Sequence, residues 1–239
     1  MRGRFATRAH AVEHLDAPTL DAKVLREALR QIAGVNRWLG GARAVLKHLT
    51  PVLEGTSVLS VLDVGTGAAD IPIRIARGAA SRGQRVSVVA MDSHPQVARF
   101  ARAACAGQCD VSVAVGDGQR LPLRTGSVDV AISSLTLHHL TDEASVMFVR
   151  EMARVARRAI ILNDLERHPL NYLGARALAS TLWRRNRYTR DDGPLSVLRS
   201  FRANEMLRIG ETAGLDSPAV FRSFPYRLVM VGRPNGRSQ

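Results

Sequence analysis

The ten residues Val61-Leu62-Asp63-Val64-Gly65-Thr66-Gly67-Ala68-Ala69-Asp70 decide the fold of this chain. A run of apolar residues passes into two glycines and then into an alanine-rich stretch, which predicts a strand, a tight turn and a helix. Glycine at positions 65 and 67 lets the backbone turn sharply and approach a ligand closely. The order of strand, glycine turn and helix is typical of the ligand-binding unit of an open α/β sheet.

Two acidic residues in this stretch discriminate between ligands. The dinucleotide pattern G-x-G-x-x-G requires glycine where this chain has Asp70. An aspartate beside a helix N-terminus is a poor neighbour for a pyrophosphate, which argues against NAD or FAD. Asp63 adds negative charge at the end of the strand, and this suits a ligand that carries an ammonium and a sulfonium. The stretch therefore favours S-adenosylmethionine.

Short β-branched runs and alanine-rich stretches alternate along the middle of the chain, as in parallel sheets built from βαβ units. The predicted strands are Val58–Val64, Arg85–Met91, Val111–Val115, Val128–Ser133 and Ala159–Asn163, and the predicted helices are Ala69–Ala80, Pro95–Ala104 and Glu143–Val155. Each strand is almost continuously hydrophobic, so we expect helices on both faces of the sheet.

The chain adds helices on either side of this alternation. Ala22–Leu49 is predicted to form one or two helices, and Leu53–Ser57 is expected to lead into the first strand, which makes residues 1–57 a helical cap or arm. Pro169–Arg187 is predicted to form a helix that ends in the polar loop Tyr188–Pro194, where Asp191, Asp192 and Gly193 stop it. Residues 165–200 are therefore expected to form a lid over the sheet.

The end of the chain predicts a helix and two strands. The helix is Phe201–Ala213, and the strands are Ala219–Ser223 and Arg227–Val231 around Pro225. So short a connection requires antiparallel strands. We predict an α/β protein with a Rossmann-like, doubly wound, mostly parallel seven-stranded sheet whose last strand is antiparallel. Residues 58–239 are expected to form one cofactor-binding domain that includes the lid.

Two further acids follow predicted strands. Asp92 comes 25 residues after Gly67, near the spacing of a carboxylate that binds the hydroxyls of a ribose. The alternative for Asp92 is a helix N-cap before Pro95. Asp117 stands between two glycines after the third strand, and its alternative is a plain turn aspartate.

These motifs resemble the class I S-adenosylmethionine-dependent methyltransferases. Asp63, Gly65 and Gly67 fit the family motif (D/E)-x-G-x-G-x-G, with Ala69 in place of the third glycine, and GDGQRLPL at 116–123 resembles G-D-A-x-x-L-P-F. The resemblance implies that Asp117 accepts the adenine amino group and that the backbone at Gly118 meets the ring edge. Three residues of the same motifs complete the expected cofactor site: Thr66, Ser93 and Ser133.

Tandem histidines follow the fourth strand and are similar to those of ubiquinone and menaquinone methyltransferases, as is the stretch Val35–Gly40. A hydroxyl acceptor must lose a proton, and histidine is the natural base near neutral pH. His138 and His139 are the candidates, with His139 preferred because it lies further from the strand. Alternatively, one caps the next helix and the other packs against the cofactor. Asp164 and His168 are additional candidates.

The net charge of +13 raises the question of an anionic partner. Lys23 and Lys47 are the only lysines among 34 basic residues, and the arginines are spread along the whole chain, which favours a compositional bias. The cluster at 184–190 has three interpretations: a solvated helix end, a clamp for an anionic substrate, or an RNA contact in which Trp183 and Tyr188 stack on bases. The (N/D)-P-P-(Y/F) motif of amino-directed nucleic-acid methyltransferases is missing after the fourth strand.

The amino-acid composition excludes several other classes of protein. A chain of 239 residues with 46% hydrophobic and 23% charged residues is neither collagen-like nor disordered. Cys105 and Cys109 are too few for a disulfide framework or a complete zinc site. No apolar run reaches the roughly 18 residues of a spanning helix, and charges interrupt the N-terminus before a signal peptide could form. We expect a cytoplasmic monomer or homodimer without a metal ion.

The predicted activity is transfer of a methyl group to a small-molecule acceptor of secondary metabolism. O-methylation of a phenolic, polyketide-like or quinone-type molecule is favoured, because a histidine base is useful only where a proton must leave. The alternatives are C-methylation of a quinone-type ring, an RNA methyltransferase, and a protein that binds the cofactor without transfer.

Overall fold

The computed structural model describes residues 3–54 and 58–235 and contains one seven-stranded sheet with the order β3-β2-β1-β4-β5-β7-β6. Its strands are β1 (Val58–Val64), β2 (Arg85–Asp92), β3 (Val111–Val115), β4 (Val128–Ser134), β5 (Ala156–Leu165), β6 (Asp216–Ser223) and β7 (Arg227–Arg233). The pairs among β1 to β5 are parallel, and β7 runs antiparallel between β5 and β6. The predicted fold class is confirmed, including the antiparallel last strand.

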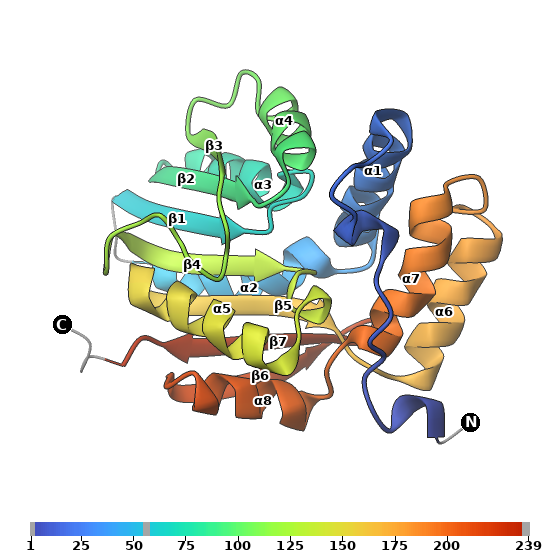
Figure 1. Ribbon diagram of the computed structural model, residues 1–239. Coiled ribbons are helices and arrows are strands. Elements are labelled where there is room, and N and C mark those ends of the chain that lie inside the picture. The colour runs from blue at the N-terminus through green and yellow to red at the C-terminus, as the bar shows by residue number, and fades with distance from the viewer. Residues whose placement is uncertain (1–2, 55–57, 236–239) are drawn as a thin grey trace.

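Helices cover both faces of the sheet, as the hydrophobic strands predicted (Figure 1). On one face, apolar residues of α2 (Gly41–Leu53), α3 (Asp70–Ala80) and α4 (Pro95–Ala104) pack against the strands. On the other face, α5 (Asp142–Val155) and α8 (Ala203–Thr212) form a second core. Each helix buries one apolar stripe, so the sheet is the middle layer of three.

Three helices lie beyond the carboxyl ends of the parallel strands. These are α1 (Ala22–Trp38), α6 (Pro169–Ser180) and α7 (Arg187–Arg199), and the N-terminal segment runs along them (Figure 1). Leu25 and Leu29 of α1 share a small core with Tyr188 of α7. Open α/β sheets bind their ligands at this edge, so these helices enclose the region where a site is expected.

The structure corrects the sequence prediction in the lid region. The predicted helix Pro169–Arg187 ends at Ser180, and the predicted loop Tyr188–Pro194 lies inside α7. Asn186 caps α7 by accepting the backbone N–H of Tyr188 at 3.0 Å. Asp192, read as a helix stop, accepts the backbone N–H groups of His14 and Leu15. The apparent turn residues therefore serve tertiary contacts, which periodicity cannot reveal.

Other boundaries move by a few residues. Residues 22–49 form two helices, and α2 continues to Leu53, so the predicted lead-in from Leu53 begins later; its residues 55–57 lie outside the described part. The predicted strand Ala219–Ser223 begins earlier, at Asp216, because the pairing with β7 extends to Arg233. In the part of the chain described here, none of the helices combines the length and the apolar character needed to cross a membrane.

Candidate functional site

The glycine turn after β1 is held by its own side chains. Asp63 is buried at the end of β1, and Thr66 Oγ1 donates to its Oδ2 at 2.7 Å. Gly65 has φ +75°, and a Cβ there would lie 2.2 Å from Thr136 Oγ1 on the loop after β4. No larger residue fits at this position, so the turn can form only with glycine.

Ala69 stands where the family motif has its third glycine. Its φ is +56°, in the left-handed region, and it occupies the N-cap position of α3. The backbone therefore keeps the conformation that a glycine would adopt freely, at the cost of placing a Cβ in an unfavourable region. The departure from the motif changes the side chain and leaves the path of the turn intact.

Asp92, at the end of β2, bridges to the glycine turn. Its Oδ2 accepts the backbone N–H of Gly67 at 3.1 Å, and its Oδ1 accepts that of His94 at 3.0 Å. The N-cap interpretation of Asp92 is wrong, because His94 caps α4 through its ring nitrogen and the N–H of Gln96. Each Asp92 oxygen keeps a lone pair for a ligand hydroxyl. Ser93 is exposed beside it.

The remaining cofactor candidates lie on neighbouring strand ends. Asp117 is exposed after β3 and accepts the N–H of Gln119 at 2.8 Å. A Cβ at Gly118 would lie 2.4 Å from the Phe148 ring, so glycine is required for this packing. Ser133 is buried, and its hydroxyl donates to the carbonyl of Val64 at 2.7 Å. Asp117 is open to a ligand, whereas the Ser133 hydroxyl is committed to joining β1 and β4.

The cofactor turn carries an excess of negative charge. Burial raises the pKa of Asp63 to about 7 and that of Asp70 to about 6, and it also raises the pKa of Asp92. Asp63 Oδ1 and Asp70 Oδ2 are buried without a hydrogen-bond partner. Buried carboxyl groups are unfavourable as anions unless a cation reaches them. This environment suits a ligand with positive charge and disfavours a pyrophosphate.

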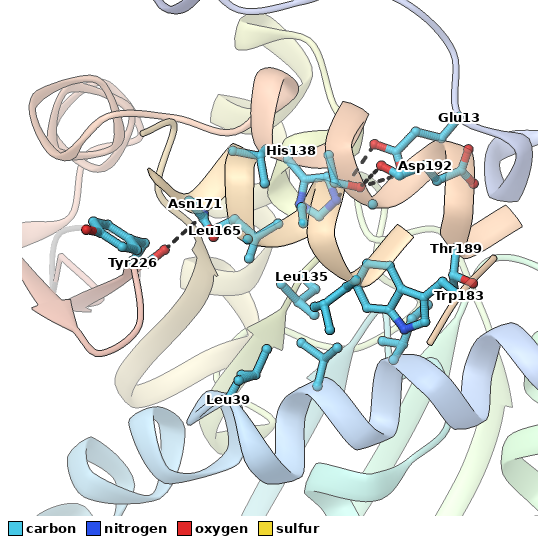
Figure 2. Close-up of a pocket in the computed structure, with 18 of the residues that line it drawn as sticks. Glu13, Leu39, Leu135, His138, Leu165, Asn171, Trp183, Thr189, Asp192 and Tyr226 are labelled. Atoms are coloured by element: carbon cyan, nitrogen blue, oxygen red, sulfur yellow. Dashed lines mark hydrogen bonds and ion pairs between the residues drawn. The ribbon is translucent and has the colours of Figure 1, made fainter. Parts of the chain in front are cut away.

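A cavity of about 410 Å³ lies next to this turn, between α1, α6, α7 and the loop after β4 (Figure 2). Most of its wall is apolar: Leu15, Ile32, Val35, Leu39, Leu135, Leu165, Leu170, Gly174, Ala175, Leu178, Trp183, Gly193, Val197 and Pro225. Its polar lining residues are Glu13, His138, His139, Asn171, Thr189, Asp192, Ser196 and Tyr226. Among the described residues no lysine or arginine lines this cavity, which we call the acceptor pocket.

His138 is fixed at the wall of the acceptor pocket. It is 3% exposed, its Nδ1 lies 2.6 Å from Oδ1 of Asp164, and its backbone N–H donates to Oδ2 of the same residue at 2.9 Å. Burial alone would raise the pKa of Asp164, but the contact with His138 outweighs it and lowers that pKa. An ionised Asp164 assigns the Nδ1 proton to His138 and leaves Nε2 turned away from β5.

His139 has a carboxylate partner of its own. Its Nδ1 lies 2.6 Å from Oδ1 of Asp16 in the N-terminal segment, and its side chain is 23% exposed. Burial would lower the pKa of His139, but the charges of Glu13 and Asp16 outweigh it and raise the pKa to about 9. Both predicted histidines therefore face one pocket, and His139 is the more accessible of the two.

No motif in the sequence marks the residues that support this pair. Glu13 places its carboxylate 3.9 Å from Nε2 of His138 and 3.8 Å from Nε2 of His139. Arg199 of α7 donates to the carbonyls of both histidines, at 3.1 and 2.6 Å, and to Asp16 at 2.8 Å. These residues lack a motif, because their relationship exists only after the N-terminal segment and α7 have folded over the sheet.

The remaining functional residues predicted from the sequence lie away from the two histidines. His168 caps α6 by accepting the N–H of Leu170 at 3.2 Å and stacks on Tyr226, with ring centroids 4.5 Å apart. Trp183 and Tyr188 are 9% and 4% exposed, so neither ring offers a face for base stacking. The arginines at 184, 185, 187 and 190 are exposed and are not among the residues that line the pocket. Thr141 caps the helix after the histidines, so neither histidine has that role.

The sheet order, the glycine turn and the acids around it are those of a class I S-adenosylmethionine-dependent methyltransferase, a class whose cofactor is S-adenosylmethionine. Residues 61–159 match the family described as the methyltransferase domain. This match runs from within β1 to the start of β5 and includes the turns that carry the expected cofactor residues.

One curated protein is similar in part of its sequence, and solved structures share the fold. Malonyl-[acyl-carrier protein] O-methyltransferase of Geobacter sulfurreducens is 29% identical over 125 residues, which are 51% of this chain and 45% of that protein. The chain thus spans slightly less than half the length of this curated relative. A methyltransferase structure from Aquifex aeolicus has a TM-score of 0.64 at 19% identity and covers 91% of this chain and all of its own. Human N-acetylserotonin methyltransferase with S-adenosylmethionine has a TM-score of 0.65 at 16% identity, with 90% of this chain and 57% of that chain covered.

Proposed function

We propose that this protein transfers a methyl group from S-adenosylmethionine to a hydroxyl of a small, uncharged and largely apolar acceptor. A phenolic, polyketide-like or quinone-type metabolite fits this description. The observation that carries the proposal is the acceptor pocket, an apolar cavity of about 410 Å³ with two carboxylate-held histidines in its wall. Leu135 lines this pocket, and its neighbour Thr136 lies against Gly65 of the cofactor turn.

The chain's own residues would prepare the acceptor for transfer. When bound, the cofactor supplies an electrophilic methyl group, and reaction requires the acceptor oxygen in line with it at about 3–3.5 Å. The apolar walls exclude water and position the acceptor, while the hydroxyl proton passes to Nε2 of His138, or to Nε2 of His139 once that ring has lost the proton that its raised pKa of about 9 retains at neutral pH. Asp16 and Asp164 act as positioning residues, because each holds the opposite ring nitrogen.

The cofactor roles assigned from the family resemblance form part of this proposal. Asp63 would face the positive charges of the cofactor, Asp92 the ribose hydroxyls, and Asp117 with Gly118 the adenine. Residues 1–57 would act as the cap and residues 165–200 as the lid, because Glu13 and α6 with α7 close the acceptor pocket. We also propose that the protein is a cytoplasmic monomer or homodimer with a role in secondary metabolism.

The pocket lining favours an uncharged acceptor over an anionic one. The named substrate class of the curated relative is a malonyl group on an acyl carrier protein. A free carboxylate in this pocket would meet Glu13 and Asp192 and, among the lining residues, no arginine or lysine. Burial and the nearby Glu13 raise the pKa of Asp192 to about 6, so negative charge is already disfavoured there. RNA is disfavoured because the candidate stacking rings are buried.

C-methylation is the second candidate, and the His138–Asp164 contact supports it as well. A carbon flanked by carbonyl groups, or an electron-rich ring, must also lose a proton, and the same histidine nitrogens would accept it. The two reactions differ in the atom that bears the methyl group, which the shape of an apolar pocket leaves open.

The test begins with the cofactor. Thermal unfolding is recorded with S-adenosylmethionine, S-adenosylhomocysteine and NAD; a ligand at 100 times its Kd stabilises the fold by about 2.7 kcal/mol. We expect stabilisation by the first two compounds and none by NAD.

The protein is then incubated with methyl-¹³C-labelled cofactor and a panel of phenols, polyketide-like compounds and quinols, in single turnover. The carbon chemical shift of the product methyl group distinguishes oxygen from carbon acceptors. Cofactor binding without product from any acceptor would favour the non-catalytic alternative, and salt-sensitive transfer to RNA would favour the nucleic-acid alternative.

A further inference from the structure

Three potential metal ligands meet at the wall of the acceptor pocket. One nitrogen each of His138 and His139 and one carboxylate oxygen of Glu13 all lie within 4.8 Å of one another. The contacts of Glu13 with the two Nε2 atoms, at 3.9 and 3.8 Å, are too long for hydrogen bonds. Ligand atoms around a tetrahedral zinc ion are separated by about 3.4 Å, given bonds of about 2.0–2.2 Å. The two separations from Glu13 exceed this value by about 0.5 Å, and no pair of the three ligand atoms is more than 4.8 Å apart, so the side chains would have to move closer together to bind an ion.

The orientation of both imidazole rings suits metal coordination. Asp164 lies 2.6 Å from Nδ1 of His138, and Asp16 lies 2.6 Å from Nδ1 of His139. Metal-bound histidines commonly donate their second ring N–H to a carboxylate, which fixes the tautomer and aims the other nitrogen. Here both rings have this support, and both aim Nε2 at the same carboxylate. Two nitrogen lone pairs facing a carboxylate repel it unless protons or a cation lie between them.

Glu13 also has an unused ligand atom. Its side chain is 1% exposed, and its Oε2 accepts the hydroxyl of Ser196 at 2.9 Å. Its Oε1 is buried with no hydrogen-bond partner, and Nε of Arg199 lies 3.7 Å away, an ion pair that is too long for a hydrogen bond. A buried carboxylate oxygen without a partner is costly. A cation bound by Oε1 and the two Nε2 atoms would compensate for all three groups at once.

We propose that Glu13, His138 and His139 bind a divalent transition-metal ion, with Zn²⁺ as the best match to two imidazoles and one carboxylate. All three residues line the acceptor pocket, so the remaining coordination position faces the acceptor. An acceptor hydroxyl would give up its proton to bulk water as it enters the pocket, and the cation would then hold it as the oxyanion. This role rests on the proposed methyl transfer and replaces the histidine base, since the same lone pairs cannot hold both a metal ion and a proton. Metal binding itself does not depend on that reaction.

Metal binding is measured on the full chain after dialysis against a chelator. Zn²⁺ is titrated by calorimetry, and Co²⁺ is added as a coloured probe whose visible absorption reports the coordination. We expect one ion per chain. Glu13→Gln and His139→Asn should each weaken binding at least tenfold, and Asp16→Asn, which alters only the support of a ligand, by about 10–100-fold. His168→Asn is the matched control: it changes a histidine that caps α6 and lies outside the pocket, and asparagine is also a good cap.

Each outcome separates this inference from the proposed function. The cofactor-induced rise in unfolding temperature is measured for every variant and shows that the fold is retained. Failure of the wild-type chain to bind Zn²⁺ or Co²⁺, or equal affinity in the wild type and Glu13→Gln, overturns the metal site. Methyl transfer that persists in chelator would then agree with a histidine base. Stoichiometric metal binding with loss of transfer on chelation, restored by Zn²⁺, supports the inference in full.

Discussion

Nδ1 of His138 lies 2.6 Å from Oδ1 of Asp164, while the backbone N–H of His138 donates to Oδ2 of the same carboxylate at 2.9 Å. Asp164 thus holds both the ring and the main chain of one residue. Both partners are buried at the carboxyl ends of β4 and β5, where water cannot compete for these contacts. The imidazole has one orientation and one tautomer, and its Nε2 is directed to the acceptor pocket.

Asp164→Asn should lower kcat by about 10²–10⁴-fold, the usual range for a general base or a positioned ligand. The amide can donate to Nδ1 and so stabilise the opposite tautomer, with the proton on Nε2. The dissociation constant of S-adenosylmethionine should stay within about twofold, because Asp164 contacts none of the expected cofactor residues. Steady-state kinetics and calorimetry measure the two quantities. An unchanged kcat would show that His138 has no part in the reaction.

Asp63→Asn tests the charge at the cofactor turn. Burial raises the pKa of Asp63 to about 7, well above its value of about 3.8 in the unfolded chain. Between these two values the folded state holds a proton that the unfolded state has lost, so the ligand-free protein loses stability as pH rises from about 4 to about 7. The variant avoids this loss and should be more stable than the wild type at pH 8, by up to about 4 kcal/mol.

The same substitution should have the opposite effect on cofactor binding. In the wild type, affinity for S-adenosylmethionine should increase as pH rises through 7, because ionised Asp63 attracts the positive charges of the cofactor. In Asp63→Asn the affinity should be weaker at pH 8 and nearly independent of pH. Urea unfolding and calorimetry at pH 5, 6, 7 and 8 give both curves. Parallel pH profiles for the two proteins would contradict the assigned role.

Gly174→Phe tests the boundary of the acceptor pocket. Gly174 lines the pocket from within α6, and a Cβ there meets no atom within 4 Å. A side chain in this helix should cost no stability, since glycine is disfavoured in helix interiors. The phenylalanine should raise the KM of the acceptor at least tenfold and leave cofactor affinity unchanged. Gly174→Ala provides the control, because it changes the helix without filling the pocket; equal KM values in both variants would place the acceptor elsewhere.

Arg199→Met tests the attachment of the N-terminal segment. The Arg199 guanidinium is 9% exposed and joins Asp16 to the carbonyls of both histidines. Removing it takes a buried charged donor from Asp16, which keeps its contacts with His139 and the Glu13 N–H, and from the two carbonyls, so we expect a loss of about 3 kcal/mol in unfolding free energy. Proteolysis near residue 16 should become faster. Arg190→Met removes an exposed ion pair with Asp191 and should change neither measurement. Similar behaviour of the two variants would contradict a structural role for Arg199.

The sequence was most informative where local patterns and tertiary structure coincide. The strands β1, β2, β4 and β5 lie inside the sheet and are nearly continuous in hydrophobicity, so their positions are set by residues that are buried in any parallel sheet. Gly65 is required by its left-handed backbone and by the approach of Thr136, and such requirements are visible as glycine in the sequence. The sequence also predicted that the last two strands are antiparallel, because the connection around Pro225 is short.

Prediction failed where polar residues have tertiary partners. Asp192 and Gly193 have the composition of a turn, yet they lie inside α7, where Asp192 binds the N-terminal backbone and Gly193 makes room for the Trp183 ring. Asp92 has the position of a helix cap, yet His94 performs that function. In each case the prediction rested on a local conformational preference that is worth little free energy. A buried contact formed in the folded protein is worth more and decided the structure.

The sequence by itself determined the α/β fold, the glycine turn and the family resemblance that pointed to S-adenosylmethionine, because these depend on periodicity and on residue types at fixed spacing. The sequence also identified His138 and His139 as candidate bases. Only the tertiary structure decided what surrounds them: Glu13, Asp16 and Arg199 reach the two histidines from the N-terminal segment and from α7. Contacts between residues so far apart in the chain leave no local pattern, since they form only when the N-terminal segment and α7 pack together beyond the carboxyl ends of the strands.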